Sequence, residues 1–85
     1  MEFLKYDFEL QENDAVKVSL SSQANVRLMD YSNFQNYKSG RQHSYIGGLV
    51  KETPYIVRPP HAGHWYLAID LGGYSGRISA TVAII

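Results

Sequence analysis

Apolar and polar residues alternate along most of this chain, at the spacing typical of β-strands that bury one face. The alternation covers residues 3–10 and, after the polar turn 11–14, residues 16–20, and a third short run covers residues 25–30. The pattern therefore predicts three strands in the first third of the chain. Because a short polar turn separates the first two, we consider a hairpin between them.

The alternation of apolar and polar residues stops between Asp30 and Gly40, where aromatic residues recur at every third position. Asp30 and Ser32 are candidate helix caps at the start of this stretch, and Gly40 is a candidate stop. The spacing predicts one short helical turn, with an irregular excursion between two sheets as the alternative. The aromatic residues concerned are Tyr31, Phe34 and Tyr37.

Strand-like alternation resumes at residue 43 and continues to the end of the chain. The pair Gly47-Gly48 interrupts it, which predicts a bulge or turn there. Pro54 introduces a further strand over residues 55–58, since proline is tolerated at the first position of a strand. In the strand 64–71 one face is uniformly apolar and is predicted to lie in the core: Trp65, Leu67, Ile69 and Leu71.

The glycines of segment 72–76 predict a tight hairpin that uses positive φ angles and leads into a closing strand. In that strand we expect Ile78, Ala80, Val82 and Ile84 to point inward. About seven strands separated by turn signals predict an all-β fold, a small antiparallel, jelly-roll-like β-sandwich with at most one short helical turn. We expect residues 1–85 to form a single domain.

The composition indicates the cellular compartment of the protein and excludes some classes of partner. The 85 residues include no cysteine, which suits a reducing compartment, and the first residues have no signal-like apolar stretch, so we expect a cytoplasmic protein. The longest apolar run is too short to cross a bilayer. Eight basic residues balance eight acidic ones without a run of either sign, so we expect neither nucleic acid nor a membrane as a partner.

Several motifs resemble the bacterial domain-of-unknown-function family DUF1883 over essentially the whole chain. They are Ala24-Asn-Val-Arg-Leu-Met-Asp30, Gly47-Gly-Leu-Val-Lys51, Pro54-Tyr55 and Gly63-His-Trp-Tyr-Leu-Ala-Ile-Asp-Leu-Gly-Gly-Tyr-Ser-Gly76. The chain is similar, more loosely, to bacterial pre-peptidase carboxyl-terminal (PPC-like) β-sandwich domains. Some members of the first family are joined to TIR signalling domains, so the resemblance implies a separate signalling effector of that kind as a partner.

Candidate metal and catalytic groups are sparse. Three imidazoles, those of His43, His61 and His64, are potential zinc ligands, but no cysteine supports them. The alternative is that His61 is a solvated turn residue and His64 a surface strand residue. Ser75 among the glycines lacks the spacing and the following helix of a nucleophile elbow, and no phosphate loop is present. We therefore expect no enzyme, no catalytic residue, no metal and no cofactor.

Asp70 stands next to the glycine turn. Together with loop carbonyls it would suit calcium, but a single acid is too few for that ion. The favoured interpretation is structural, with the Asp70 carboxylate accepting hydrogen bonds from amides of the turn.

Aromatic residues exceed the needs of so small a core, with seven tyrosines, three phenylalanines and one tryptophan. Exposed tyrosines suit recognition, because their rings stack on sugars or bases and contact proteins. The candidate ligand-binding surface consists of Tyr45, Tyr66, Asp70, Tyr74 and Arg77. The alternative is that Tyr45 and Tyr55 pack into the core while the other tyrosines cover sheet edges.

Two functions remain open. The first is a noncatalytic recognition module that binds a protein, a saccharide or another small ligand, for instance as a sensor that clusters a signalling effector. The second is a homo-oligomeric assembly domain, because Ile85 is apolar on the outward face and sandwich edges can pair with another copy.

Overall fold

The computed structural model describes residues 3–74 and 76–85, and this part of the chain folds into seven strands and one helix. The prediction of a small all-β sandwich with one short helix is confirmed. The elements are β1 (Leu4–Leu10), β2 (Val16–Leu20), β3 (Ala24–Met29), α1 (Tyr31–Lys38), β4 (Ile46–Val50), β5 (Tyr55–Val57), β6 (Gly63–Asp70) and β7 (Ala80–Ile84).

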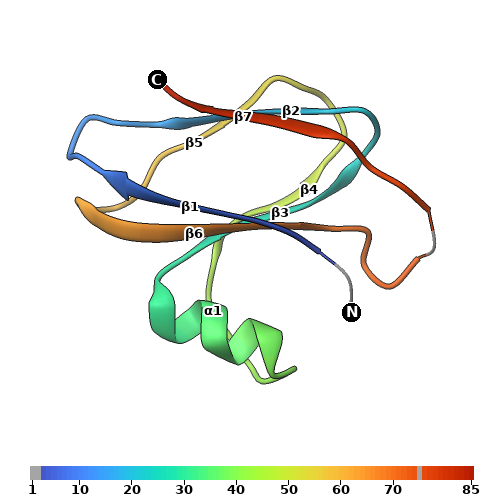
Figure 1. Cartoon of the computed structure of the whole chain (residues 1–85), viewed down its shortest axis with the longest axis horizontal. Helices are drawn as coiled ribbons and strands as arrows, with labels where there is room; N and C mark the ends of the chain where they lie inside the picture. The colour runs from blue at the N-terminus through green and yellow to red at the C-terminus, as the bar shows by residue number, and fades with distance from the viewer. Residues whose placement is uncertain (1–2, 75) are drawn as a thin grey trace.

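The strands form two antiparallel sheets (Figure 1). The four-stranded sheet has the order β1-β6-β3-β4 and the three-stranded sheet the order β5-β2-β7. Strands β4 and β5 contact each other along one side of the sandwich, so β1 and β7 are the edge strands of the other side. The hairpin considered between β1 and β2 is wrong, because β1 pairs with β6 while β2 pairs with β5 and β7.

The core lies between the two sheets. Trp65 is only 5% exposed, which confirms the predicted apolar face of β6, and its indole N–H donates to the His61 carbonyl at 3.0 Å. Ile84 shares the face of buried Val16 but is 46% exposed, because it lies near the end of an edge strand. The central buried residues come from both sheets: Leu10, Val26, Leu28, Leu67 and Ile69 from one, Val16, Val18 and Val57 from the other.

Helix α1 covers the outer face of the four-stranded sheet (Figure 1). Asp30 caps it by accepting a hydrogen bond from the Asn33 amide at 2.9 Å, as its position in the sequence predicts. The helix spans eight residues, more than the single turn expected. Phe34 and Tyr37 are buried in a second apolar cluster, which the helix forms with Met29 and Ala68 of the sheet. The described residues contain no helix with the length and hydrophobicity that a membrane crossing requires.

Strand β4 runs straight through Gly47 and Gly48, so the bulge or turn expected there is wrong. Gly47 pairs with Arg27 of β3 at a very close approach, since a Cβ added to Gly47 would lie 2.2 Å from the carbonyl oxygen of Val26. Its φ of +129° also favours glycine. The glycine therefore permits pairing instead of ending it.

The segment after β6 is not a hairpin, because β6 and β7 belong to different sheets. The chain crosses here from one layer to the other. The positive φ angles expected at the glycines are confirmed, with +68° at Gly72, +89° at Gly73 and +140° at Gly76. The segment joins the three-stranded sheet where Ser79 exchanges hydrogen bonds with Ser21 at 2.9 Å each.

Candidate functional site

A buried carboxylate organises the outer face of the four-stranded sheet. Asp70, the last residue of β6, forms an ion pair with the guanidinium of Arg27 on β3. Its oxygens also accept hydrogen bonds from the Tyr37 hydroxyl at 2.6 Å, the Asn25 side-chain amide at 3.0 Å and the Gly72 backbone amide at 2.8 Å. We call these five residues the Asp70 centre. The Gly72 bond confirms the structural role expected for Asp70.

The protonation states of the centre follow from its contacts. Burial by itself raises the pKa of Asp70, but hydrogen bonds from Tyr37, Asn25 and Gly72 and the charge of Arg27 hold that pKa below its usual value. Burial and the hydrogen bond to Asp70 raise the pKa of Tyr37 far above its usual value. Neither group titrates near neutral pH, so the centre holds fixed charges in place.

Arg27 lies between two tyrosine rings. Its guanidinium carbon is 5.3 Å from the ring centre of Tyr37 and 5.1 Å from that of Tyr45, the geometry of cation–π contacts. Its Nε is buried and has no hydrogen-bond partner among the described residues. Because its neighbour in β4 is Gly47, no side chain covers Arg27 from that strand, and Tyr45 and Leu49 flank the gap with exposed fractions of 44% and 54%.

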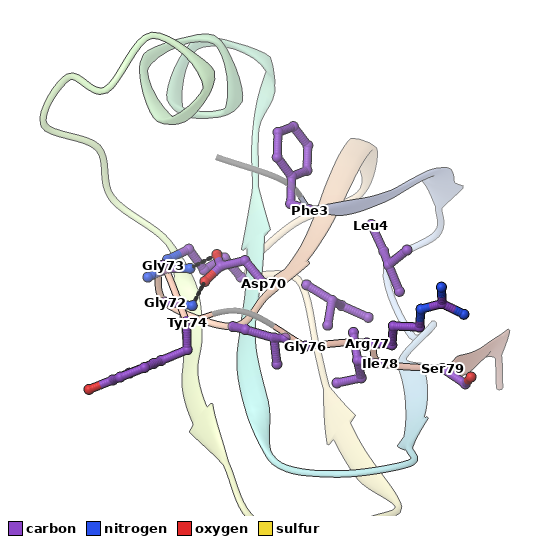
Figure 2. A pocket seen from close by; sticks show the side chains of 13 residues that line it. Phe3, Leu4, Asp70, Gly72, Gly73, Tyr74, Gly76, Arg77, Ile78 and Ser79 are labelled. Atoms are coloured by element: carbon purple, nitrogen blue, oxygen red, sulfur yellow. Dashed lines mark hydrogen bonds and ion pairs between the residues drawn. The ribbon is translucent and has the colours of Figure 1, made fainter.

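An open groove begins at the Asp70 centre and continues along the end of the sandwich, where the chain crosses from β6 towards β7 (Figure 2). Arg27, Asp70 and Gly72 line one end of it. Figure 2 shows Leu4, the first residue of β1, on one side and Arg77, Ile78 and Ser79 on the other, while the ring of Phe3 points towards the helix.

The groove combines apolar walls with a surplus of positive charge. Leu4, Leu71 and Ile78, each half-buried, contribute apolar surface. Its charged side chains are Arg27, Asp70 and Arg77, so two positive charges face one negative charge. Arg27 is neutralised by Asp70, whereas Arg77 is exposed and forms no ion pair within the described residues. The groove can therefore accept an apolar group beside an anionic one.

The five residues expected to form one binding surface lie in three surroundings. Asp70, Tyr74 and Arg77 line the groove, but Asp70 is buried, and the ring of Tyr74, which is 83% exposed, points away from the groove in Figure 2. Tyr45 covers Arg27. Tyr66 stacks on Phe34 under the helix, with ring centres 4.8 Å apart.

The reason for this separation is topological. The expected surface required β6 and β7 to share an outward face, and the two strands lie in different sheets. The alternative for the tyrosines holds in part, since Tyr55 packs against the core while Tyr45 does not.

Sequence reasoning missed Arg27, Tyr37 and Asn25 as members of the site. A signal was present, because Asn25 and Arg27 alternate with Val26 and Leu28 and so must face away from the core. Their partner Asp70 is 45 and 43 residues away along the chain, and no local pattern links the two positions.

The three histidines lie apart. The His43 ring packs edge-on against Tyr37 at 5.2 Å, and the His61 ring lies 5.0 Å from that of Trp65. His64 bonds Glu9 through Nδ1 and Asp7 through Nε2, so its two nitrogens point to different carboxylates. Within residues 3–74 and 76–85, no group of three or more ligating side chains is placed to hold a metal ion. Ser75 lies outside the described residues.

Comparison with known proteins gives one match. The model of a family described as "Domain of unknown function (DUF1883)" matches residues 1–85, the whole length of the chain. No curated protein and no solved structure matches it.

Proposed function

The chain belongs to the DUF1883 family, and on that premise we propose that it is a noncatalytic recognition module whose ligand or protein partner occupies the groove beside the Asp70 centre. The observation that carries this proposal is the groove itself, which brings the exposed Arg77 and the apolar side chains of Leu4 and Ile78 into one lining. Binding sites commonly combine apolar walls with a few fixed polar groups in this way.

The Asp70 centre supports recognition more than catalysis. General acid–base catalysis needs a group that exchanges protons near neutral pH. The pKa of Asp70 is shifted down and that of Tyr37 is shifted up, so both move away from that range. We propose that the centre keeps the end of the groove rigid, with Arg27 as a fixed cation beside the bound molecule.

We further propose that the module acts in the cytoplasm as a sensor for a separate signalling effector, such as a TIR domain. The absence of cysteine from the sequence and the family resemblance support this setting. In this arrangement the groove binds the signal or the effector, and the edge strand β7 remains available for clustering.

A screen of a small-molecule library by protein-observed NMR tests the recognition site. We expect the amide shifts caused by hits to gather at Gly72, Gly73, Ile78 and Ser79, and to weaken in Arg77→Glu but not in Arg58→Glu. Arg58 is a matched control because it is an exposed arginine outside the groove. Hits scattered over the surface, turnover of any hit, or no hit at the groove would contradict the proposal.

Homo-oligomeric assembly is the second candidate function, and β7 favours it. This strand is the edge of its sheet, and Ile84 and Ile85 at its end are 46% and 54% exposed. An edge strand with exposed apolar residues can pair with a second copy. Assembly predicts a stable oligomer in analytical ultracentrifugation that Ile85→Glu dissociates. A monomer at all concentrations would remove this candidate.

A further inference from the structure

We propose that the partner is an extended, acidic segment of another protein, which adds as a strand along the free edge of β1 and places a carboxylate on Arg77. This inference rests on the proposed function, because it takes the groove as the binding site and names the class of molecule that enters it.

The free edge of β1 begins at the groove, which Leu4 lines. Strand β1 pairs only with β6 within the described residues, so the backbone groups of its other edge have no strand partner. Strand β7 is likewise the last strand of its sheet, and β1 and β7 lie on the side of the sandwich that the β4–β5 contact does not close. An unpaired edge of this kind is a template for an added strand.

The walls of the groove suit the alternating side chains of a strand. Leu4 and Ile78 offer apolar surface on opposite walls, and Arg77 and Ser79 offer polar groups next to Ile78 (Figure 2). Successive side chains of an extended peptide point to opposite sides. One set of side chains therefore contacts apolar surface while the other set remains near Arg77.

Arg77 favours an acidic peptide over a neutral or basic one, since the acids of β1, Asp7 and Glu9, already contact His64. Arg77 is an exposed guanidinium without an ion-pair partner in the described part of the chain, whereas the carboxylate of Asp70 is already bound by Arg27. A carboxylate fits a guanidinium with two parallel hydrogen bonds. A basic segment would be repelled by Arg77, because the acid that lines the groove, Asp70, is already bound by Arg27.

The form of the groove favours a segment of protein over a small metabolite. The groove is open and reaches the start of β1. The free backbone N–H and C=O groups of that edge are spaced to pair with the backbone of another strand, which a small metabolite does not have. A second copy of this chain is the competing occupant, through one of its own edge strands. Its β7 has no acid, and the two acids of its β1, Asp7 and Glu9, already contact His64.

Selection from a library of random twelve-residue peptides displayed on phage, against the whole chain, tests the inference. We expect enriched sequences in which Asp or Glu alternates with apolar residues. The best synthetic peptide should bind Arg77→Glu at least about tenfold more weakly than wild type, roughly the value of one charge-assisted contact. Replacing its acidic residue by Lys should restore binding to Arg77→Glu, and Arg58→Glu should bind like wild type.

A structural readout locates the peptide. We expect the bound peptide to slow hydrogen exchange at amides of β1, because strand addition occupies that edge. Enriched peptides without acids, binding unaffected by Arg77→Glu, unprotected β1 amides, or no enrichment at all would overturn the inference. So would a dimer of the free chain that occupies the same edge.

The outcomes separate this inference from the proposed function. If small molecules shift groove residues while no acidic peptide binds there, the inference fails and the recognition site stands. If peptides and small molecules both shift residues away from the groove, both fail. Far-UV circular dichroism of Arg77→Glu checks that the variant is folded, which we expect because the side chain is exposed.

Discussion

Asp70 is a charged side chain without access to water, and its environment has to replace all of its hydration. Four partners do so: the Arg27 guanidinium, the Tyr37 hydroxyl, the Asn25 amide and the backbone amide of Gly72. They come from strand β3, helix α1 and the crossing segment, and Asp70 itself belongs to β6. One carboxylate thus joins the four parts of the chain that border the site.

Removing this carboxylate is expected to be costly. In Asp70→Ala, Arg27 keeps its charge while 82% of its side chain is buried, and breaking such a pair costs about 3–5 kcal/mol of unfolding free energy. Urea unfolding measures the loss. The double variant Arg27→Leu/Asp70→Leu should recover much of it, because no charge remains buried. A loss below about 1 kcal/mol in Asp70→Ala, or no recovery in the double variant, would contradict this account.

His64 makes stability depend on pH. Its ring nitrogens lie 2.9 Å from a Glu9 oxygen and 2.8 Å from an Asp7 oxygen, and only the imidazolium donates both hydrogen bonds. The hydrogen bond to Glu9 and then that to Asp7 raise the pKa of His64 above 6.5. Because the folded pKa is raised, the stabilisation is complete below about pH 6.5 and is lost as the pH rises through the folded value.

Thermal unfolding of wild type and His64→Gln across this range checks the effect. The melting temperature of wild type should exceed that of the variant at low pH, and the difference should shrink as the pH rises. The effect is small because the side chain is exposed. The double variant Asp7→Asn/Glu9→Gln is the control and should lose the pH dependence. A difference that grows with pH would show that the imidazolium is not the stabilising form.

At the scale of elements, the pairing of β4 with β3 requires glycine at position 47. Ala at position 47 would place its Cβ 2.2 Å from the Val26 carbonyl oxygen, whereas Ala at 48, also at positive φ, would meet nothing within 4 Å. We expect Gly47→Ala to lose about 1–3 kcal/mol more unfolding free energy than Gly48→Ala. Chemical denaturation of the two variants measures this difference. Equal losses would mean that the φ angle alone selects glycine.

Strands β1, β2 and β3 are the most directly predictable from the sequence, because each alternates apolar and polar residues over at least five positions. Strand β4 shows the limit, since its two glycines read as an interruption while the close approach that requires Gly47 depends on a separate strand. The turn residues after β1 and after β6 both favour hairpins, and neither turn forms one. Turn residues alone do not tell whether the next strand stays in the same sheet or crosses the core.

The candidate site was predictable only where its contacts are local. The bond from the Gly72 amide to Asp70 spans two residues, and the sequence indicates it. The pairing of Arg27 with Asp70 and the packing of Tyr45 on Arg27 depend on the order β6-β3-β4, which no local pattern determines. Arg77 reaches the groove because the chain changes layers after β6.

At the scale of the whole molecule, the two sheets depend on one shared core. Buried side chains of the four-stranded sheet, such as Leu67, pack in the same cluster as Val16 and Val18 of the three-stranded sheet. At this chain length, neither sheet can bury its apolar face without the other. Loss of packing in one layer should therefore destabilise both layers together.

We expect Leu67→Ala and Val18→Ala to lower the midpoint of a single unfolding transition, observed alike by Trp65 fluorescence and by far-UV circular dichroism. Leu67 is fully buried, so its truncation should cost about 2–5 kcal/mol. The matched control is Leu49→Ala, which removes an exposed leucine of β4 and should leave the midpoint nearly unchanged. If the two probes separated in Val18→Ala, with the dichroism changing before the fluorescence, the three-stranded sheet would unfold by itself. In that case the groove would lose one wall while the Asp70 centre remained folded. A single, preformed binding site between the layers therefore requires that the two transitions coincide.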